Sequence, residues 1–162
     1  MKKPYYTIAI IAIIFILLDR ISKEFLVALL YATPNKEIPL LPFFDLTMVW
    51  NYGISFGMFQ SPVFGHYIFP AIALIVSVIL FIWCIKKYRE GEKRRYLNAC
   101  GLIIAGAVGN SIDRFQWGAV ADFFYFNYGK LFFPAFNVAD VAIFFGAVIL
   151  IIDSFIHDGK KS

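Results

Sequence analysis

The chain has 162 residues, of which 60% are hydrophobic and only 16% are charged. Soluble domains usually carry about 25% charged residues, so this composition excludes an ordinary soluble protein and indicates a membrane protein with several spans. The formal net charge is +4, which we attribute to basic residues in cytoplasmic loops, and we expect no nucleic-acid partner. With two Cys and two His, the chain lacks a disulfide framework and a typical zinc motif, so no metal is expected.

The first expected membrane span covers residues 5–31. Lys2 and Lys3 precede an apolar run, as in a secretory signal peptide, but no cleavage site of small residues follows directly after it. We therefore expect a retained helix with its N-terminus in the cytoplasm. Asp19 and Lys23 lie four residues apart on one face of this helix and are expected to form a structural ion pair.

Residues 32–65 have a mixed composition with four Pro and three Gly, which are unfavourable for a helix. Residues 46–50 have short β character. We expect a small extracytoplasmic β-like element that lies on the bilayer between the first and second helices. Asn51 and Gly53 predict a turn that brings amide and backbone groups close to another part of the molecule.

The second expected span covers residues 66–85 and is apolar throughout, so we assign no chemistry to it. The loop over residues 86–95 follows with six Lys and Arg residues, and such a loop is typical of the cytoplasmic side. Cys84 and Cys100 flank this loop, and we expect both to be free thiols because the cytoplasm is reducing.

The third expected span covers residues 96–114. This helix carries small residues at every fourth position: Gly101, Ala105 and Gly109. Such a stripe lets helix backbones approach closely. Asn110 and Arg114 lie one turn apart near its end and are expected to point the same way, towards packed protein.

Residues 115–136 form the second expected outer segment, an irregular loop. It is interrupted by Gly118, Gly129 and Pro134. Asp122 lies in this loop between apolar and aromatic residues, where a charged carboxylate is costly. The fourth expected span covers residues 137–156, with Asn137 as N-cap and Asp140 at the third helical position.

These elements predict an all-α membrane protein of four transmembrane helices in a single domain, residues 1–162, with both termini in the cytoplasm. Ten of the 15 Lys and Arg residues fall in the segments assigned to the cytoplasm, which supports this orientation. The same topology gathers several polar residues near the outer membrane face: Asp19, Asn51, Asp113, Arg114, Asp122, Asn137 and Asp140.

The outer face offers carboxylates rather than a nucleophile. Ser22 and Lys23 are adjacent, so on a helix they point apart, and neither a Cys nor a His is placed for a triad. Two neighbouring carboxyl groups can share one proton and act as acid and base. We expect Asp122 and Asp140 to form that pair. Capping or salt bridging remains the alternative for each residue taken alone.

The two carboxyl groups are expected to take different roles. A helix N-terminus favours the anion of Asp140, whereas aromatic surroundings favour the protonated form of Asp122. Asp140 is therefore expected to act as base and Asp122 as acid. Asp113, next to Arg114, is expected to have a structural ionic role.

Five motifs occur in order along the chain: DRISK, NYGISFG, GNSIDR, VADF and FNVAD. In this order and at these intervals they resemble the lipoprotein signal peptidase family, also called signal peptidase II, over nearly the whole chain. The resemblance implies an intramembrane aspartyl endopeptidase in the bacterial inner membrane, with its active site at the extracytoplasmic face and no cofactor. The implied partners are membrane lipid and prolipoprotein substrates, which are cut just before a diacylglyceryl-modified Cys by what we expect to be a monomer.

The resemblance also implies roles for single residues. Asp122 in VADF and Asp140 in FNVAD correspond to the catalytic dyad. The positions that correspond to polar, site-lining or substrate-binding residues are Asn51 with its neighbour Gly53, Asn110, Arg114 and Asn137. The positions that correspond to residues holding the architecture are Asp19, Lys23 and Asp113.

Two other classes of protein compete with a peptidase. A small proton-coupled transporter would use buried Asp residues as a proton relay, but it favours charges deep in the membrane or internal symmetry, and the sequence has neither. A non-catalytic membrane scaffold would not require Asp122 and Asp140 to lie together.

Overall fold

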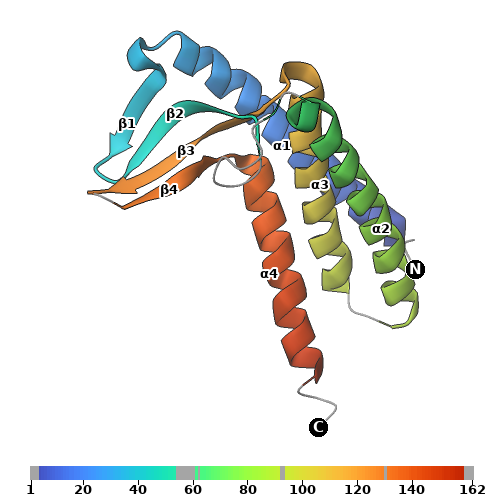
Figure 1. The fold of residues 1–162 in the computed structure, drawn as a ribbon. Coiled ribbons are helices and arrows are strands. Elements are labelled where there is room, and N and C mark those ends of the chain that lie inside the picture. The colour runs from blue at the N-terminus through green and yellow to red at the C-terminus, as the bar shows by residue number, and fades with distance from the viewer. Residues whose placement is uncertain (1–3, 54–60, 62, 92–93, 130, 159–162) are drawn as a thin grey trace.

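The computed structural model describes residues 4–53, 61, 63–91, 94–129 and 131–158, which form four long helices and a small sheet (Figure 1). The elements in chain order are α1 (Pro4–Tyr31), the 3-10 turn η1 (Pro34–Lys36), β1 (Glu37–Leu41), β2 (Phe44–Asn51), the π-helical turn η3 (Phe64–Ile68), α2 (Phe69–Arg89), α3 (Arg94–Trp117), β3 (Val120–Tyr128), β4 (Leu131–Phe136) and α4 (Val138–Asp158). Each expected span coincides with one of these helices, with ends that differ by a few residues. The last four residues of the NYGISFG motif lie outside the described residues.

The expectation of an all-α fold with one β-like element is wrong in one respect, because the two outer segments together form a four-stranded antiparallel sheet in the order β1-β2-β3-β4. Gly118 and Gly129 adopt φ values of +74° and +61°, so they form turns on either side of β3 rather than interrupting a loop. Pro134 lies on the outer strand β4, where a missing N–H is tolerated.

The sheet joins the two outer segments next to the polar residues. Strand β2 pairs with β3, and this register places Val49 opposite Asp122 and Asn51 opposite Val120. The loop that was expected around Asp122 is therefore a strand in the middle of the sheet. A central strand holds its side chains more firmly than a loop does, because both of its edges are hydrogen-bonded.

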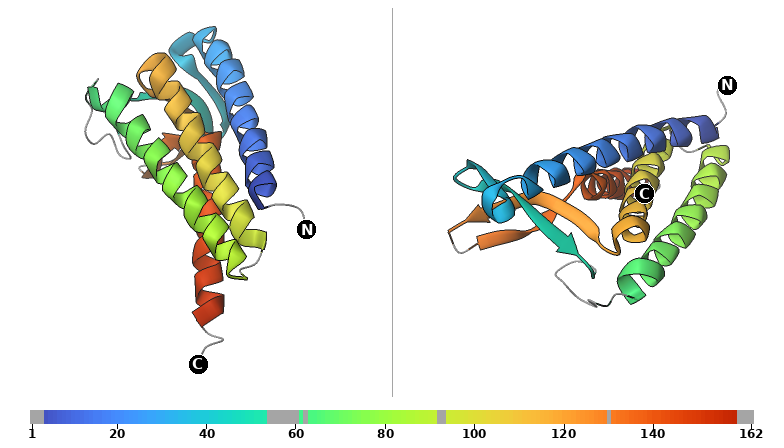
Figure 2. Two further views of the ribbon diagram at one scale, coloured as in Figure 1. Left: turned by 90° about the vertical axis from the view of Figure 1, so that its right-hand side faces the viewer. Right: turned by 90° about the horizontal axis from the view of Figure 1, so that it is seen from above.

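Helix α3 occupies the centre of the helical part and packs against α1, α2 and α4 (Figure 2). The sheet lies at one end of the helices, whereas the turn between α2 and α3 and both ends of the chain lie towards the other (Figure 1). The polar network described below lies where the sheet meets α1, α3 and α4.

The small-residue stripe of α3 allows the close packing that its spacing predicts. A Cβ atom on Gly101 would lie 2.9 Å from the Cβ of Ile11 in α1, and one on Gly106 would overlap the backbone of Ala139 in α4. A Cβ on Gly109 would lie 2.7 Å from a carboxylate oxygen of Asp19. Glycine is thus needed where α3 packs against α1 and α4.

The outer surfaces of the helices are strongly apolar. Helix α1 exposes an aliphatic face: Ile10, Ile13, Ile14, Leu17, Leu18 and Ile21. Within the described residues, two helices are long and apolar enough to cross a membrane by length and composition, over Phe64–Arg89 and Val138–Phe155. Apolar surface of this extent on a mostly helical protein suits a lipid environment.

The prediction of free cysteines is wrong at the end of the molecule opposite the sheet. Cys84 and Cys100, expected as free thiols, are joined by a disulfide that links α2 to α3. Both residues are fully buried, and the sequence alone did not show that the two helices bring them face to face. In the same half, Arg95 forms an ion pair with the buried Asp153 of α4.

Candidate active site

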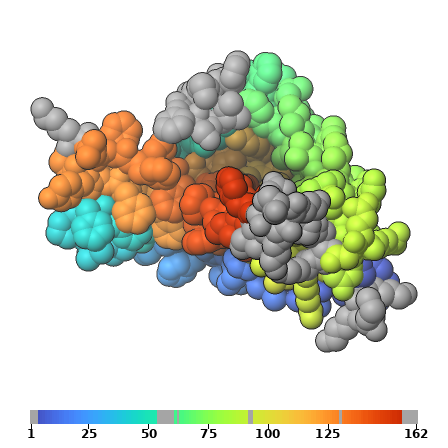
Figure 3. All heavy atoms as spheres, turned by 90° about the horizontal axis from the view of Figure 1, so that it is seen from below, coloured from blue at the N-terminus to red at the C-terminus, as the bar shows by residue number. Residues whose placement is uncertain are grey.

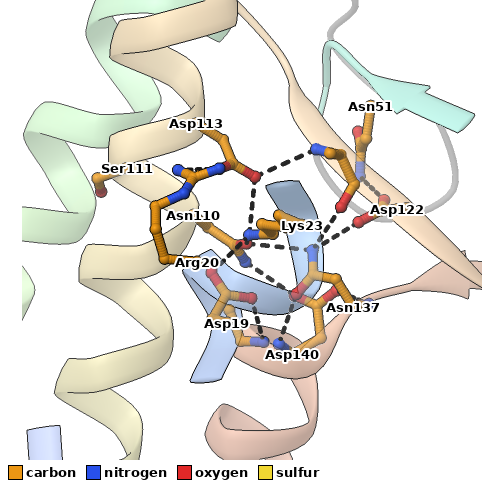
Figure 4. A network of polar contacts seen from close by, with 12 residues as sticks. Asp19, Arg20, Lys23, Asn51, Asn110, Ser111, Asp113, Asp122, Asn137 and Asp140 are labelled. Atoms are coloured by element: carbon orange, nitrogen blue, oxygen red, sulfur yellow. Dashed lines mark hydrogen bonds and ion pairs between the residues drawn. The ribbon is translucent and has the colours of Figure 1, made fainter. Parts of the chain in front are cut away.

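Asp122 and Asp140 both lie in a network of side-chain amides between the sheet and the helices (Figure 4). Asp122, on β3, is 3% exposed. One of its oxygens accepts a hydrogen bond from Asn137 Nδ2 at 2.7 Å, and the other accepts one from Asn51 Nδ2 at 3.2 Å. Asp122 therefore contacts amide groups rather than a cation.

Asp140 is held by the start of its own helix and by α3. Its Oδ2 accepts a hydrogen bond from Asn137 N–H at 3.1 Å, while Asn137 Oδ1 accepts one from Asp140 N–H at 3.0 Å. This reciprocal pair confirms the expected N-cap. Asn110 Nδ2 donates to the other carboxylate oxygen, Oδ1, at 2.9 Å.

Asn137 connects the two acidic residues. Its side-chain nitrogen faces Asp122, while its backbone N–H and its amide oxygen are bonded to Asp140. Asn137 is completely buried and also donates to Ala121 O at 3.3 Å. One residue thus fixes the start of α4 relative to β3.

A second group of charged residues lies beside this network. Lys23 forms the expected ion pair with Asp19, at 2.8 Å, and a second one with Asp113, at 2.7 Å. Asp113 is also paired with Arg20 at 2.9 Å and not with its neighbour Arg114. We refer to Asp19, Arg20, Lys23 and Asp113 as the ionic cluster.

The ionic cluster also holds backbone groups near the acidic pair. Asp19 Oδ1 accepts a hydrogen bond from Ala139 N–H at 2.9 Å, in the first turn of α4. Asp113 Oδ2 accepts one from Ala121 N–H at 3.2 Å, next to Asp122. The cluster therefore supports both segments that carry the candidate catalytic residues.

Arg114 is buried and joins the outer segment to α3. It donates to Gly53 O at 2.5 Å and to Gly65 O at 3.3 Å. Gly53 N–H in turn donates to Asn51 Oδ1 at 3.2 Å, which forms the expected turn. Arg114 and Asn110 both line one cavity beside α3, although Arg114 donates to Gly53 O and to neither acidic residue.

The surroundings of Asp122 change its acidity. Burial and, second to it, the nearby charge of Asp140 together raise the pKa of the Asp122 carboxyl to about 7, against the lowering effect of the hydrogen bonds from Asn51 and Asn137. The direction agrees with the expectation that Asp122 favours its protonated form.

Asp122 and Asp140 face one cavity of about 540 Å³. Asn51 also lines it, and the remaining wall is apolar: Phe133, Pro134, Ala135, Phe136, Ile143, Phe144 and Ala147. A second cavity of about 370 Å³ lies between α2, α3 and α4 and includes Asn110, Arg114 and Ile143 in its wall. Viewed from the end opposite the sheet, a hollow separates α4 from α2 with α3 behind it (Figure 3).

Two residues beside the site could not be recognised as its neighbours from the sequence. Arg20 was counted only as a charge, yet it pairs with Asp113 and lies 4.7 Å from the ring of Trp117. Ala121 contributes through its backbone alone, so its side chain carries no indication of this role. The four-residue spacing of Asp19 and Lys23 in DRISK predicted their ion pair but not the second partner of Lys23.

The chain is similar to known proteins over most of its length. Residues 11–156 match the model of the signal peptidase II family. The lipoprotein signal peptidase of Shewanella amazonensis is 42% identical over 148 residues, which is 90% of this chain and 84% of the relative. The lipoprotein signal peptidase of Caulobacter vibrioides is 38% identical over 153 residues, covering 93% and 88% of the two chains.

Solved structures show the same fold. A bacterial membrane enzyme determined by the in meso method at 2.3 Å resolution superimposes with a TM-score of 0.72 and 26% identity, over 96% of this chain and 92% of the other. A second bacterial membrane enzyme, determined at 1.9 Å, gives a TM-score of 0.65 and 27% identity, over 90% of each chain.

Fold, family match and relatives together define an aspartic-type peptidase, a hydrolase. The chain belongs to the signal peptidase II family, whose members remove signal peptides from prolipoproteins. The alternative of a proton-coupled transporter is not favoured, because the whole matched length belongs to a peptidase family.

Proposed function

We propose that this peptidase cuts prolipoproteins by acid–base hydrolysis with Asp122 and Asp140, at the bond just before the lipidated Cys. The observation that carries the proposal is that Asn137 bonds both acidic residues and that both line one cavity. The apolar wall of this cavity can receive an extended peptide and the acyl chains next to the scissile bond.

The proposed chemistry assigns one task to each carboxyl group. Asp140 is the base, because the N-terminus of α4 and two N–H donors favour its anion. It takes a proton from water while the water oxygen attacks the carbonyl carbon. Asp122 starts protonated, and its proton stabilises the carbonyl oxygen as negative charge develops there. The C–N bond then breaks as Asp140 passes the proton that it took from water to the leaving nitrogen, which returns both carboxyl groups to their starting states.

We also infer that all four helices cross the bacterial inner membrane, with the sheet and the acidic pair on the extracytoplasmic side and one chain as the active unit. Helix α1 has 28 residues and α3 has 24, so at about 1.5 Å per residue each exceeds the roughly 30 Å apolar layer of a bilayer. The charges of Asp19 and Lys23 inside α1 do not prevent insertion, because both residues are buried against α3, and Arg20 and Glu24 pair with each other one turn apart. Helix α3 carries no charge between Arg95 and Asp113.

The central test replaces each acidic residue by its amide. Asp122→Asn and Asp140→Asn should each lower kcat about 1,000-fold or more, because a neutral amide cannot exchange the proton. Cleavage is measured as a gel shift of a diacylglyceryl prolipoprotein with purified enzyme in detergent. Asp45→Asn is the matched control, since Asp45 is a buried aspartate of the sheet bonded to Asn127. Full activity in either dyad variant would refute the assignment.

The lipid requirement is tested on the substrate. A prolipoprotein without its diacylglyceryl group should be cut at least tenfold more slowly, because its scissile bond is no longer held at the membrane edge. Equal rates for the two substrates would remove lipid anchoring from the proposal while leaving the acidic pair untouched.

Topology is tested by labelling single introduced thiols in intact cells with a membrane-impermeant reagent. Tyr128→Cys, at the exposed tip of the sheet, should react, and Glu90→Cys, in the turn between α2 and α3, should not. The reverse pattern would place the acidic pair on the cytoplasmic side and contradict the proposed orientation.

A further inference from the structure

Lys23 contacts more than its two carboxylate partners. Its ammonium group is completely buried and lies close to Asp19 and Asp113. Its third contact is Asn110 Oδ1, at 3.0 Å. An ammonium group has three N–H donors and no acceptor, so the three contacts use its full capacity. Two of them neutralise charge, and the third extends from the ionic cluster to the residue that binds Asp140.

This third contact determines which way the Asn110 amide faces. A side-chain amide has an oxygen that accepts and a nitrogen that donates, and the two ends have nearly the same shape. Because Lys23 can only donate, the end of Asn110 that faces it must be the oxygen, which Asn137 Nδ2 also approaches at 3.2 Å. The nitrogen is then directed to Asp140 Oδ1 at 2.9 Å. The opposite orientation would place the amide oxygen against the carboxylate.

We infer that Lys23 is a positioning residue for Asp140 and acts through Asn110. The Lys23 N–H donor fixes the orientation of the Asn110 amide between Lys23 and Asp140 (Figure 4). The N–H group of that amide then faces the Asp140 carboxylate, which is proposed to activate water. This inference rests on the proposed function, because it assigns a task to the neighbour of the proposed base.

The charges of the ionic cluster show that this task differs from neutralisation. The cluster holds two carboxylates and two cations, since Arg20 also pairs with Asp113. Arg20 therefore shares the electrostatic role of Lys23, but among the described residues it contacts Asp113, Glu24 and Trp117 and not Asn110. Replacement of Arg20 thus gives a control that perturbs the same cluster and leaves the orientation of Asn110 intact.

The test measures kcat and KM of the full-length enzyme in detergent on a diacylglyceryl prolipoprotein. Lys23→Met should lower kcat at least tenfold and change KM less than twofold, since it alters the base and not the substrate cavity. Arg20→Met should keep kcat within about threefold of the wild type. In an Asn110→Ala background, Lys23→Met should lower kcat by no more than a further factor of two, because the residue through which Lys23 acts is already absent.

A second variant separates catalysis from folding. Lys23→Met leaves one carboxylate excess in the cluster and can reduce the yield of folded protein. Asp19→Asn/Lys23→Met removes one anion and one cation together, and it should show the same fall in kcat per folded molecule, measured after size-exclusion chromatography. A kcat within twofold of the wild type, losses that multiply in the Asn110→Ala background, or an equal loss in Arg20→Met would overturn the inference. Failure of both Lys23 variants to fold would assign Lys23 to folding alone and overturn it too.

Failure of the positioning role of Lys23 can be distinguished from failure of the proposed function. If Asp122→Asn and Asp140→Asn are inactive while Lys23→Met is fully active, only the positioning role is lost. If either dyad variant retains full activity, the acidic pair itself is wrong, whatever Lys23→Met shows.

Discussion

Two groups of buried carboxylates lie side by side in this molecule, and they are stabilised in different ways. Asp19 and Asp113 are each within 3 Å of a cationic nitrogen. The hydrogen bonds that Asp122 and Asp140 accept from the described residues come from neutral N–H groups. A neighbouring cation favours the charged form of a carboxylate, whereas burial without a cation favours the protonated form.

This difference separates the ionic cluster from the proposed catalytic pair more clearly than burial does, because Asp122 is nearly as deeply buried as Asp19 and Asp113. It also explains why the two groups adjoin each other. The ionic cluster binds the backbone N–H groups of Ala121 and Ala139, each next in sequence to one member of the acidic pair. The ionic cluster therefore holds the backbone beside both Asp122 and Asp140 in place.

The largest expected effect on stability comes from removing a carboxylate of the ionic cluster, which tests whether this cluster has a structural role. Asp19→Ala should lower the free energy of unfolding by about 3–5 kcal/mol, because it leaves a buried ammonium with one anion fewer and frees Ala139 N–H. Thermal unfolding in detergent measures the loss, and the molecules that remain folded should still cleave substrate. A variant with wild-type stability and no activity would reverse the assignment of Asp19.

The pH dependence of stability tests the acidic pair. The pKa of Asp122 is about 7 in the folded protein, above the usual 3.8, so the folded state holds a proton that the unfolded state has lost. The Asp122 contribution is therefore fully present below pH 3.8 and is lost as the pH rises through 7. Between pH 5 and pH 8, wild type should lose about 2–3 kcal/mol more than Asp122→Asn. Parallel pH curves for the two proteins would show that Asp122 is not the titrating group.

The packing of the ionic cluster can be disturbed without changing any charge. Gly109→Ala places a methyl group 2.7 Å from an oxygen of Asp19, and such overpacking typically costs about 1–3 kcal/mol. The expected result is a lower unfolding temperature with an unchanged pH optimum of cleavage. A shifted pH optimum would show that the two groups of carboxylates are not independent.

The smallest expected effect concerns a single amide of the acidic pair. Asn51 Nδ2 donates to Asp122 and lowers its pKa, so Asn51→Ala should raise that pKa. The alkaline limb of the profile of kcat/KM against pH should move upwards by about one unit or less, which corresponds to one hydrogen bond. An alkaline limb that stays in place or moves downwards would contradict the contact between Asn51 and Asp122.

The sequence predicted the helices well, since long apolar runs bounded by charges have few alternatives. It predicted β character at residues 46–50, within β2, but not the four-stranded sheet. The run from Val120 is aromatic on both faces and shows no alternation, and Gly118 and Gly129 indicate turns and loops equally well. The pairing of β2 with β3 joins residues about 70 positions apart, and no local pattern specifies such a contact.

The candidate site was predictable to a similar degree. Motif positions and the helix start identified Asp122, Asn137 and Asp140, because capping is a local property. The partners of Asp113 were not predictable, since Arg20 reaches it from another helix. The disulfide between Cys84 and Cys100 was missed for the same reason, because it depends on the packing of α2 against α3.

The bond from Ala139 N–H to Asp19 connects the first helix of the chain with the first turn of the last. The two bonded residues are 120 positions apart in the chain. The proposed acidic pair can therefore assemble only after α4 has packed against α1, and a chain in which α4 has not yet docked carries Asp122 without the partner that the proposed chemistry requires.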